Sequence, residues 1–134
     1  MATLPIHTIE RFLKFNRLLL AKEYLEQTAI RLKDLVVTSN SLKKSVRILM
    51  ERVAIYDVYE NFSWSGKSGI LNDNVTKLVF SDLEGIINLV MVTIKMKCEE
   101  PRENVVKALK DFCKRSSQNK KRVEDKQRKA EENV

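Results

Sequence analysis

Few side chains in this sequence of 134 residues could do metal or covalent chemistry. The chain contains one histidine, His7, and two cysteines, Cys98 and Cys113. His7 lacks a set of cysteine and carboxylate neighbours at the spacing of metal ligands. A cysteine nucleophile would need His7 as its base and a carboxylate to orient that base, and no pattern in the chain supports this. We therefore expect no enzyme, no metal, no other cofactor and no small-molecule substrate.

The segment Gly66-Lys67-Ser68 resembles the end of a phosphate-binding P-loop. A P-loop requires a glycine where this chain has Asn61, and a buried strand where residues 56–62 carry acidic and amide side chains. The pattern therefore indicates a tight turn in which glycines supply positive φ angles. Lys67 stays a candidate contact for a single phosphate group.

Four aromatic residues fall within nine positions of a chain that is only 7% aromatic, namely Tyr56, Tyr59, Phe62 and Trp64. An RNA-stacking platform would have basic side chains between the rings, but this segment carries Asp57 and Glu60. Base stacking stays an alternative. The favoured interpretation is that Trp64 anchors its loop on a helical core.

The formal net charge of +7 is unevenly distributed. Residues 1–53 have 10 basic against 5 acidic residues, residues 54–113 have 7 against 9, and residues 114–134 have 8 against 4. A polyanion would be attracted to the first half and to the C-terminal tail. The candidate nucleic-acid contacts are basic residues of a helix face, the glycine turn and the tail: Lys43, Lys44, Arg47, Arg52, Lys67, Lys120, Lys121 and Arg122. Acidic residues dilute the tail, so a plain solvated tail and a nuclear-import signal stay open as well.

Cysteine content and hydropathy predict the compartment. A small secreted domain normally has four or more cysteines, whereas two fit reduced thiols inside a cell. The first residues lack the pattern of a secretory signal. The longest apolar stretch, residues 86–94, is about half the roughly 20 residues needed to span a bilayer. We expect an intracellular protein that has no membrane partner.

Helices are the expected elements, because only three glycines and two prolines interrupt the sequence. Apolar residues at helical spacing predict helices near residues 8–16, 18–35, 42–53 and 101–113, and the first two could be continuous. A shorter helix is expected to end near Asn61. Thr8 and Ser41 offer hydroxyl groups that would cap the helices that follow them.

One segment carries two conflicting patterns. Ser81 and Glu84 fit a capping box, in which each side chain bonds the other residue's backbone amide, so a helix should start at Ser81. Residues 86–97 also alternate in the period of a strand. We favour a helix here because the cap is explicit and no partner strand is visible.

The expected fold class is all-α, a small orthogonal bundle of about five helices. A single helical domain would cover residues 4–113. The basic tail over residues 114–134 would be a solvated helix or disordered.

Three features in this order carry a family resemblance: Leu-Pro-Ile-His-Thr at residues 4–8, Phe-Ser-Trp-Ser-Gly-Lys at residues 62–67, and the step from Phe80 to Leu83. Together they resemble the arthropod family called domain of unknown function 4806, over roughly residues 4–113. The sequence departs from that family in having Phe62 in place of a frequent tyrosine and a longer gap before Phe80. The resemblance implies a small helical interaction or chromatin-related module without catalytic residues. A weaker likeness is to BEN domains, helical modules that bind DNA or partner proteins.

We expect a non-catalytic interaction module that binds a protein partner or a second copy, in the nucleus rather than the cytoplasm. Its structural anchors are the residues of the tryptophan block and the following step: Phe62, Trp64, Gly66, Phe80 and Leu83. The helix over residues 83–96 is apolar nearly all round, which predicts exposed apolar surface for a partner. The alternative is sequence-poor nucleic-acid binding through basic helix faces and the tail.

Overall fold

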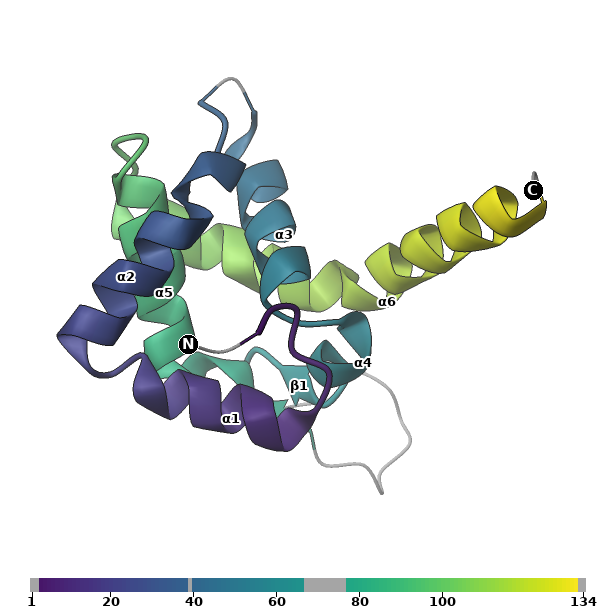
Figure 1. The fold of residues 1–134 in the computed structure, drawn as a ribbon, viewed down its shortest axis with the longest axis horizontal. Helices are drawn as coiled ribbons and strands as arrows, with labels where there is room; N and C mark the ends of the chain where they lie inside the picture. The colour runs from purple at the N-terminus through teal and green to yellow at the C-terminus, as the bar shows by residue number, and fades with distance from the viewer. Residues whose placement is uncertain (1–2, 39, 67–76, 133–134) are drawn as a thin grey trace.

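The computed structural model describes residues 3–38, 40–66 and 77–132, which form a small bundle of helices (Figure 1). Six α-helices occur in this part of the chain: α1 Ile9–Leu18, α2 Lys22–Leu32, α3 Leu42–Val53, α4 Tyr56–Tyr59, α5 Glu84–Lys95 and α6 Arg102–Glu132. Two short 3-10 helices, Lys33–Leu35 and Phe80–Asp82, lie between them. The strands β1 Phe62–Ser63 and β2 Leu78–Val79 make a small parallel ladder. The all-α fold class is confirmed.

Two helices begin at the hydroxyl caps that the sequence predicts. The Thr8 hydroxyl accepts a hydrogen bond from the backbone amide of Arg11 at 3.3 Å, and α1 follows. The Ser41 hydroxyl accepts from the amide of Lys44 at 3.2 Å, and α3 follows. Such caps depend on residues three positions apart, so local sequence is enough to find them.

Helix α5 lies at the centre of the bundle and contacts α1, α2, α3 and α6. The predicted helix is confirmed, and most of the apolar surface expected to be exposed on residues 83–96 is covered. Neighbouring helices bury five apolar residues on several sides of the helix: Ile86, Ile87, Leu89, Val90 and Ile94. Met91 and Val92 are half-buried, and Met96 is exposed. A helix that is apolar all round is typical of such a central position.

The start of α5 differs from the predicted capping box. The helix begins at Glu84, after the 3-10 turn, and its N-cap residue Leu83 offers no side-chain hydrogen bond. Instead the Asn16 side-chain oxygen, 70 positions away on α1, accepts a hydrogen bond from the Ile86 amide at 2.9 Å. Gly85 permits this contact, because a Cβ atom there would lie 2.0 Å from the Asn16 carbonyl oxygen. A tertiary contact therefore replaces the local cap.

The expected anchor residues lie beside the aromatic core. Phe62, Phe80 and Leu83 are buried, while Trp64 is half-buried and stacks on Phe80 with ring centroids 6.0 Å apart. Gly66 has φ near +81°, in the left-handed region that favours glycine. The indole therefore packs on the edge of the core and not inside it.

Helix α6 continues well beyond the expected domain end at residue 113. Its buried residues reach Ser116, and the partly buried Val123 still packs against the core. The rest of the helix extends away from the bundle (Figure 1). Residues 114–132 are therefore helical, which is one of the two alternatives left open by the sequence.

Candidate nucleic-acid interface

A cavity of about 360 Å³ lies between the first turns of α3 and the middle of α6. Its lining contains three of the predicted nucleic-acid contacts together with a fourth cation from α6: Ser41, Lys43, Lys44, Arg47, Asp111, Phe112, Arg115 and Asn119. We call it the basic cavity. Four cationic side chains and one carboxylate line it, so its local charge is strongly positive.

Helical periodicity places these side chains together. On α3, Val46, Leu49 and Met50 are buried against the core, so Lys43, Lys44 and Arg47 occupy other faces of the helix. On α6, Asp111, Arg115 and Asn119 follow one another at intervals of four residues and lie on one face. The packing of α3 against α6 brings the two sets of side chains together.

The single carboxylate neutralises only part of the basic cavity. Asp111 pairs with Arg115 at 3.0 Å and with Lys43 at 3.7 Å. Within the described chain, Lys44 and Arg47 form no ion pair with a carboxylate. The Arg47 Nε atom is enclosed and has no hydrogen-bond partner among the described residues. Two of the four cations that line the cavity therefore have no carboxylate partner among the described residues.

The backbone adds to this positive charge. The first turn of α3 contains no acidic residue, and its N-cap, Ser41, lines the cavity. The N-terminus of a helix carries a partial positive charge from its aligned peptide dipoles. Both the side chains and the helix therefore favour an anion at this place.

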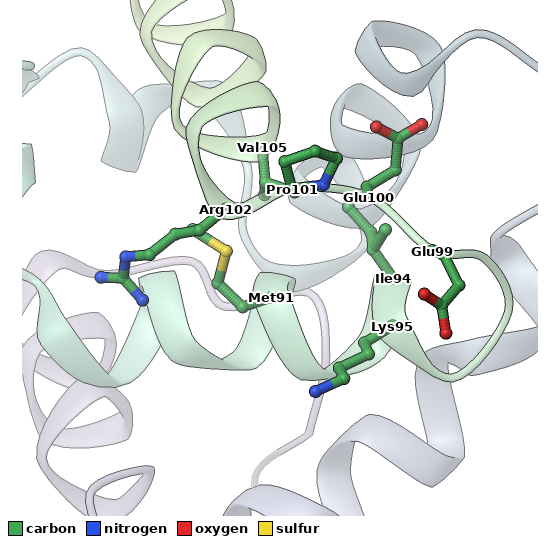
Figure 2. A pocket seen from close by; sticks show the side chains of 8 residues that line it. All are labelled: Met91, Ile94, Lys95, Glu99, Glu100, Pro101, Arg102 and Val105. Carbon is green, nitrogen blue, oxygen red and sulfur yellow. The ribbon is translucent and has the colours of Figure 1, made fainter.

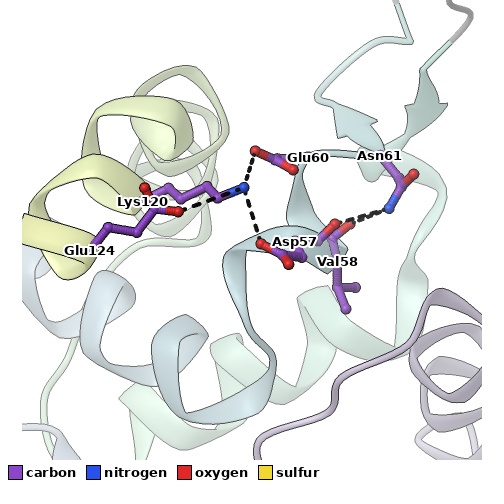
Figure 3. Close-up of polar contacts among 6 residues, drawn as sticks. All are labelled: Asp57, Val58, Glu60, Asn61, Lys120 and Glu124. Carbon is purple, nitrogen blue, oxygen red and sulfur yellow. Dashed lines mark hydrogen bonds and ion pairs between the residues drawn. The ribbon is translucent and has the colours of Figure 1, made fainter. Parts of the chain in front are cut away.

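Lys120, another predicted contact, is already paired within the chain (Figure 3). Its ammonium group lies 2.7 Å from Glu60, 3.1 Å from Asp57 and 3.9 Å from Glu124. Hydrogen bonds to Glu60 and Asp57 raise the pKa of Lys120 above its ordinary value. Lys120 joins α6 to α4, and we leave it out of the interface.

Arg122 is likewise paired, one turn further from the basic cavity than Asn119. Its guanidinium donates to a Glu51 carboxylate oxygen at 2.7 Å, and the same oxygen accepts the Tyr56 hydroxyl at 2.6 Å. Burial, followed by the hydrogen bond to Glu51, raises the pKa of Tyr56 above its ordinary value. This cluster therefore holds α3, α4 and α6 together.

The remaining predicted contacts are dispersed. Arg52 is exposed in the last turn of α3, away from the cavity, and Lys67 lies outside the described residues. Lys121 lines a more open hollow of about 470 Å³ further along α6, with a mostly basic lining: Gln118, Lys121, Arg122, Asp125, Lys126 and Lys129. Basic side chains thus continue from the cavity along α6.

A larger cavity of about 530 Å³ lies between the end of α5 and the start of α6 (Figure 2). Its lining is apolar at Met91, Ile94 and Val105, with two acidic and two basic residues around them. The charged ends of Lys95 and Arg102 lie well apart and do not converge on one position (Figure 2). Balanced and separated charges make this cavity a weaker candidate for an ionic ligand.

Arrangements for other chemistry were also sought in the described part of the chain. It contains no cluster of three or more histidine, cysteine or acidic residues that could hold a metal ion. Burial raises the pKa of the Cys113 thiol to about 12, so this thiol is protonated and a poor nucleophile at neutral pH. No helix among the described residues is long and apolar enough to cross a membrane.

Comparisons with protein-family models, with curated proteins and with solved structures find no match. The resemblance to the arthropod family and to BEN domains therefore stays a prediction from the sequence. The fold and the basic cavity place the chain in a general class: small helical modules with a strongly cationic surface cavity.

Three residues of the basic cavity were absent from the predicted contacts: Asp111, Arg115 and Asn119. Of these, the sequence had indicated Arg115 only as one charge of the basic tail. Their spacing of four residues was visible in the chain, and it indicates one helix face. Their contact with α3 was not visible, because it depends on how two helices distant in sequence pack together.

Proposed function

We propose that this chain is a non-catalytic helical module that binds nucleic acid through its phosphate backbone. The observation that carries the proposal is the excess of cations over carboxylates in the basic cavity. Phosphate contacts from lysine and arginine supply affinity without reading base sequence. The proposed binding is therefore sequence-poor, with the backbone passing the basic cavity and continuing along α6.

A base-stacking mode has less support. Trp64 stacks on Phe80 on one side, and the Lys110 ammonium lies 5.7 Å from the centre of its ring. Tyr56, Tyr59 and Phe62 are buried, so their rings are not offered to bases. Contacts to phosphate are thus the mode that the side chains favour.

Fluorescence anisotropy with a short labelled DNA duplex tests this proposal. For the unaltered chain, we expect affinity to fall steeply between about 50 and 200 mM salt, because bound cations release counterions from the duplex. The triple variant K43Q/K44Q/R115Q should bind more weakly and with a shallower salt dependence. Arg52→Gln, which removes one exposed charge of the same helix outside the cavity, is the control. Equal affinities of the triple variant and the unaltered chain would contradict the proposal.

A protein partner is the second candidate function, supported by a different cavity. This cavity of about 360 Å³ lies beside α1 and α2 and is lined by Ile6, Phe15, Leu18 and Tyr24, with Arg11 and Lys14 also in its lining. Apolar walls beside two cations fit an apolar side chain next to an acidic one. A partner protein or a second copy could supply that pair.

Light scattering over a range of protein concentrations tests self-association, and a pull-down with Leu18→Ser as the comparison tests a partner protein. Loss of the complex in L18S would support the second candidate. A strict monomer that captures no partner would count against it. A nuclear location is part of either proposal, and imaging of the tagged full chain in cells tests it.

A further inference from the structure

We propose that the basic cavity is a discrete site for one phosphate group, with Arg47 as its principal donor. This inference rests on the proposed function, since the phosphate would belong to a nucleic-acid backbone. One phosphate would occupy a defined position in the cavity, whereas neighbouring phosphates would be held only by long-range electrostatic attraction.

The environment of Arg47 is the first reason. Its side chain is half-buried, and its Nε atom is enclosed without a hydrogen-bond partner among the described residues. A buried donor without an acceptor is unfavourable, and most such donors in folded proteins are satisfied. Because the Nε atom is enclosed, the guanidinium must turn toward the cavity before a phosphate oxygen can supply the missing acceptor. Planar guanidinium groups suit phosphate oxygens particularly well.

The position of the only carboxylate is the second reason. Asp111 pairs with Lys43 and Arg115 and so holds both cations at the cavity. It forms no ion pair with Lys44 or Arg47 in the described part of the chain. These two cations are therefore available to an external anion, while the other two remain close enough to add to the attraction.

The size and wall of the cavity are the third reason. Its volume of about 360 Å³ exceeds the roughly 30 Å³ that one water molecule occupies, so a hydrated phosphate group fits. The N-terminal turn of α3 forms part of the wall and contributes its dipole.

The surroundings favour a nucleic acid over a phosphorylated protein. The basic side chains of α6 continue past the cavity, with Lys121, Lys126 and Lys129 lining the next hollow. A single phosphorylated side chain would leave this second group of cations unused, whereas a phosphodiester backbone would reach both.

Titration of the full chain with inorganic phosphate, followed by amide NMR at constant ionic strength, tests the inference. We expect saturable shifts at the amides of Lys44 and Arg47. Arg47→Met should weaken phosphate binding about tenfold, as expected for loss of a charged hydrogen bond. Arg52→Met, which removes an exposed arginine from the same helix, should leave binding unchanged. Arg47→Lys should fall between them, because it keeps the charge and loses the planar donor.

Three results would overturn the discrete site. They are shifts that grow linearly without saturation, shifts spread evenly over all basic residues, and equal effects of Arg47→Met and Arg52→Met. If Arg47→Met does not fold, as judged by circular dichroism, the exposed Lys44→Gln replaces it and should also weaken phosphate binding.

The duplex experiment separates this inference from the proposed function. Duplex binding that is lost in K43Q/K44Q/R115Q without any local phosphate site would support the proposed function alone. A saturable phosphate site in a chain that does not bind the duplex would support the site and overturn its assignment to nucleic acid. Tighter binding of a phosphoserine peptide than of a duplex would likewise assign the site to a phosphorylated protein.

Discussion

The α1–α5 contact and the α3–α6 contact both join helices that are distant in sequence, but they are built differently. Where α1 meets α5, Gly85 lets the backbones approach closely and Asn16 closes the end of the helix. Where α3 meets α6, charged side chains surround a cavity, and the donor Nε of Arg47 has no acceptor among the described residues. The first contact is complete within the chain, whereas the second leaves Lys44 and Arg47 without a carboxylate partner among the described residues.

This difference suggests a separation of roles. Changes in the α1–α5 contact should reduce the free energy of unfolding and leave phosphate binding by the folded molecule unaltered. Changes in the basic cavity should weaken phosphate binding and leave the free energy of unfolding nearly unaltered. Proteins commonly tolerate such unfavourable local arrangements at binding sites.

The largest effect is expected for Gly85→Ala. The new Cβ atom would lie 2.0 Å from the Asn16 carbonyl oxygen, so α1 and α5 must move apart. Overpacking against backbone should cost about 3 kcal/mol or more, a large share of the roughly 5–15 kcal/mol that stabilises a typical domain. Chemical denaturation measures the loss. Glu84→Ala, at the exposed neighbouring position, is the control, and equal stability of the two variants would refute the close-approach explanation.

Asn16→Ala should have the next largest effect. It removes the acceptor of the Ile86 amide and leaves the first turn of α5 without its side-chain cap. Loss of a cap typically costs about 1–2 kcal/mol. Asn16→Asp retains an acceptor oxygen, so it should recover most of the stability in the same denaturation experiment. If Asn16→Ala were neutral, the tertiary cap would have no energetic role.

Cys113 packs against the core on one side of α6, and its thiol should make the free energy of unfolding depend on pH. Burial raises the pKa of its thiol to about 12, so the folded chain keeps the proton while an unfolded thiol loses it above about pH 8.5. A raised folded-state pKa stabilises below the unfolded pKa, and this stability is lost as pH rises through the interval between the two values. Unfolding free energy should therefore fall between about pH 8.5 and 10.5, by at most about 1.4 kcal/mol per pH unit from this group. A Cys113→Ala variant should show a shallower fall, and an identical slope would contradict the assignment.

Lys120→Met should destabilise the chain only slightly, although Lys120 lies close to three carboxylates. Its side chain is 27% exposed and its partners are more exposed, so solvent screens the ion pairs. Such pairs typically contribute about 1 kcal/mol or less. Thermal denaturation at low and high salt measures the effect, which should shrink as salt rises. Lys121→Met, at the neighbouring exposed cation, is the control and should be neutral.

The smallest effect on stability is expected for the double variant K43Q/K44Q, which should be neutral or slightly stabilising. It removes two like charges from a surface with few carboxylates and breaks only the 3.7 Å pair between Lys43 and Asp111. The same variant should bind a duplex more weakly in the anisotropy experiment. A clear loss of stability would show that the basic cavity serves the fold, and the contrast with the α1–α5 contact would fail.

The sequence predicted those parts of the fold that depend on neighbouring residues. Thr8 and Ser41 were identified as caps because a cap and its amide lie within one turn. The predicted cap at Ser81 was wrong because Asn16, far away in sequence, caps α5 instead. The surroundings of α5 were also missed, since apolar residues on all faces fit either an exposed patch or a central helix.

The candidate site shows the same limit. Lys43, Lys44 and Arg47 were identified from one amphipathic pattern, and the structure brings them to one cavity. Lys120 was identified from the basic charge of the tail, yet carboxylates of Asp57, Glu60 and Glu124 surround it. Charge can be read from sequence, but whether a charge is already neutralised depends on tertiary contacts.

The continuous course of α6 has a mechanical consequence. A helix of 31 residues is about 46 Å long at 1.5 Å per residue, and its first half is fixed in the core. A spin label at Lys129 should therefore keep a nearly constant distance from a second label at Lys22. Pulsed electron paramagnetic resonance should then give a narrow distribution of distances between the two labels. Helix α6 would then be a rigid extension of the bundle, so the direction of its C-terminal end would be fixed relative to the other helices.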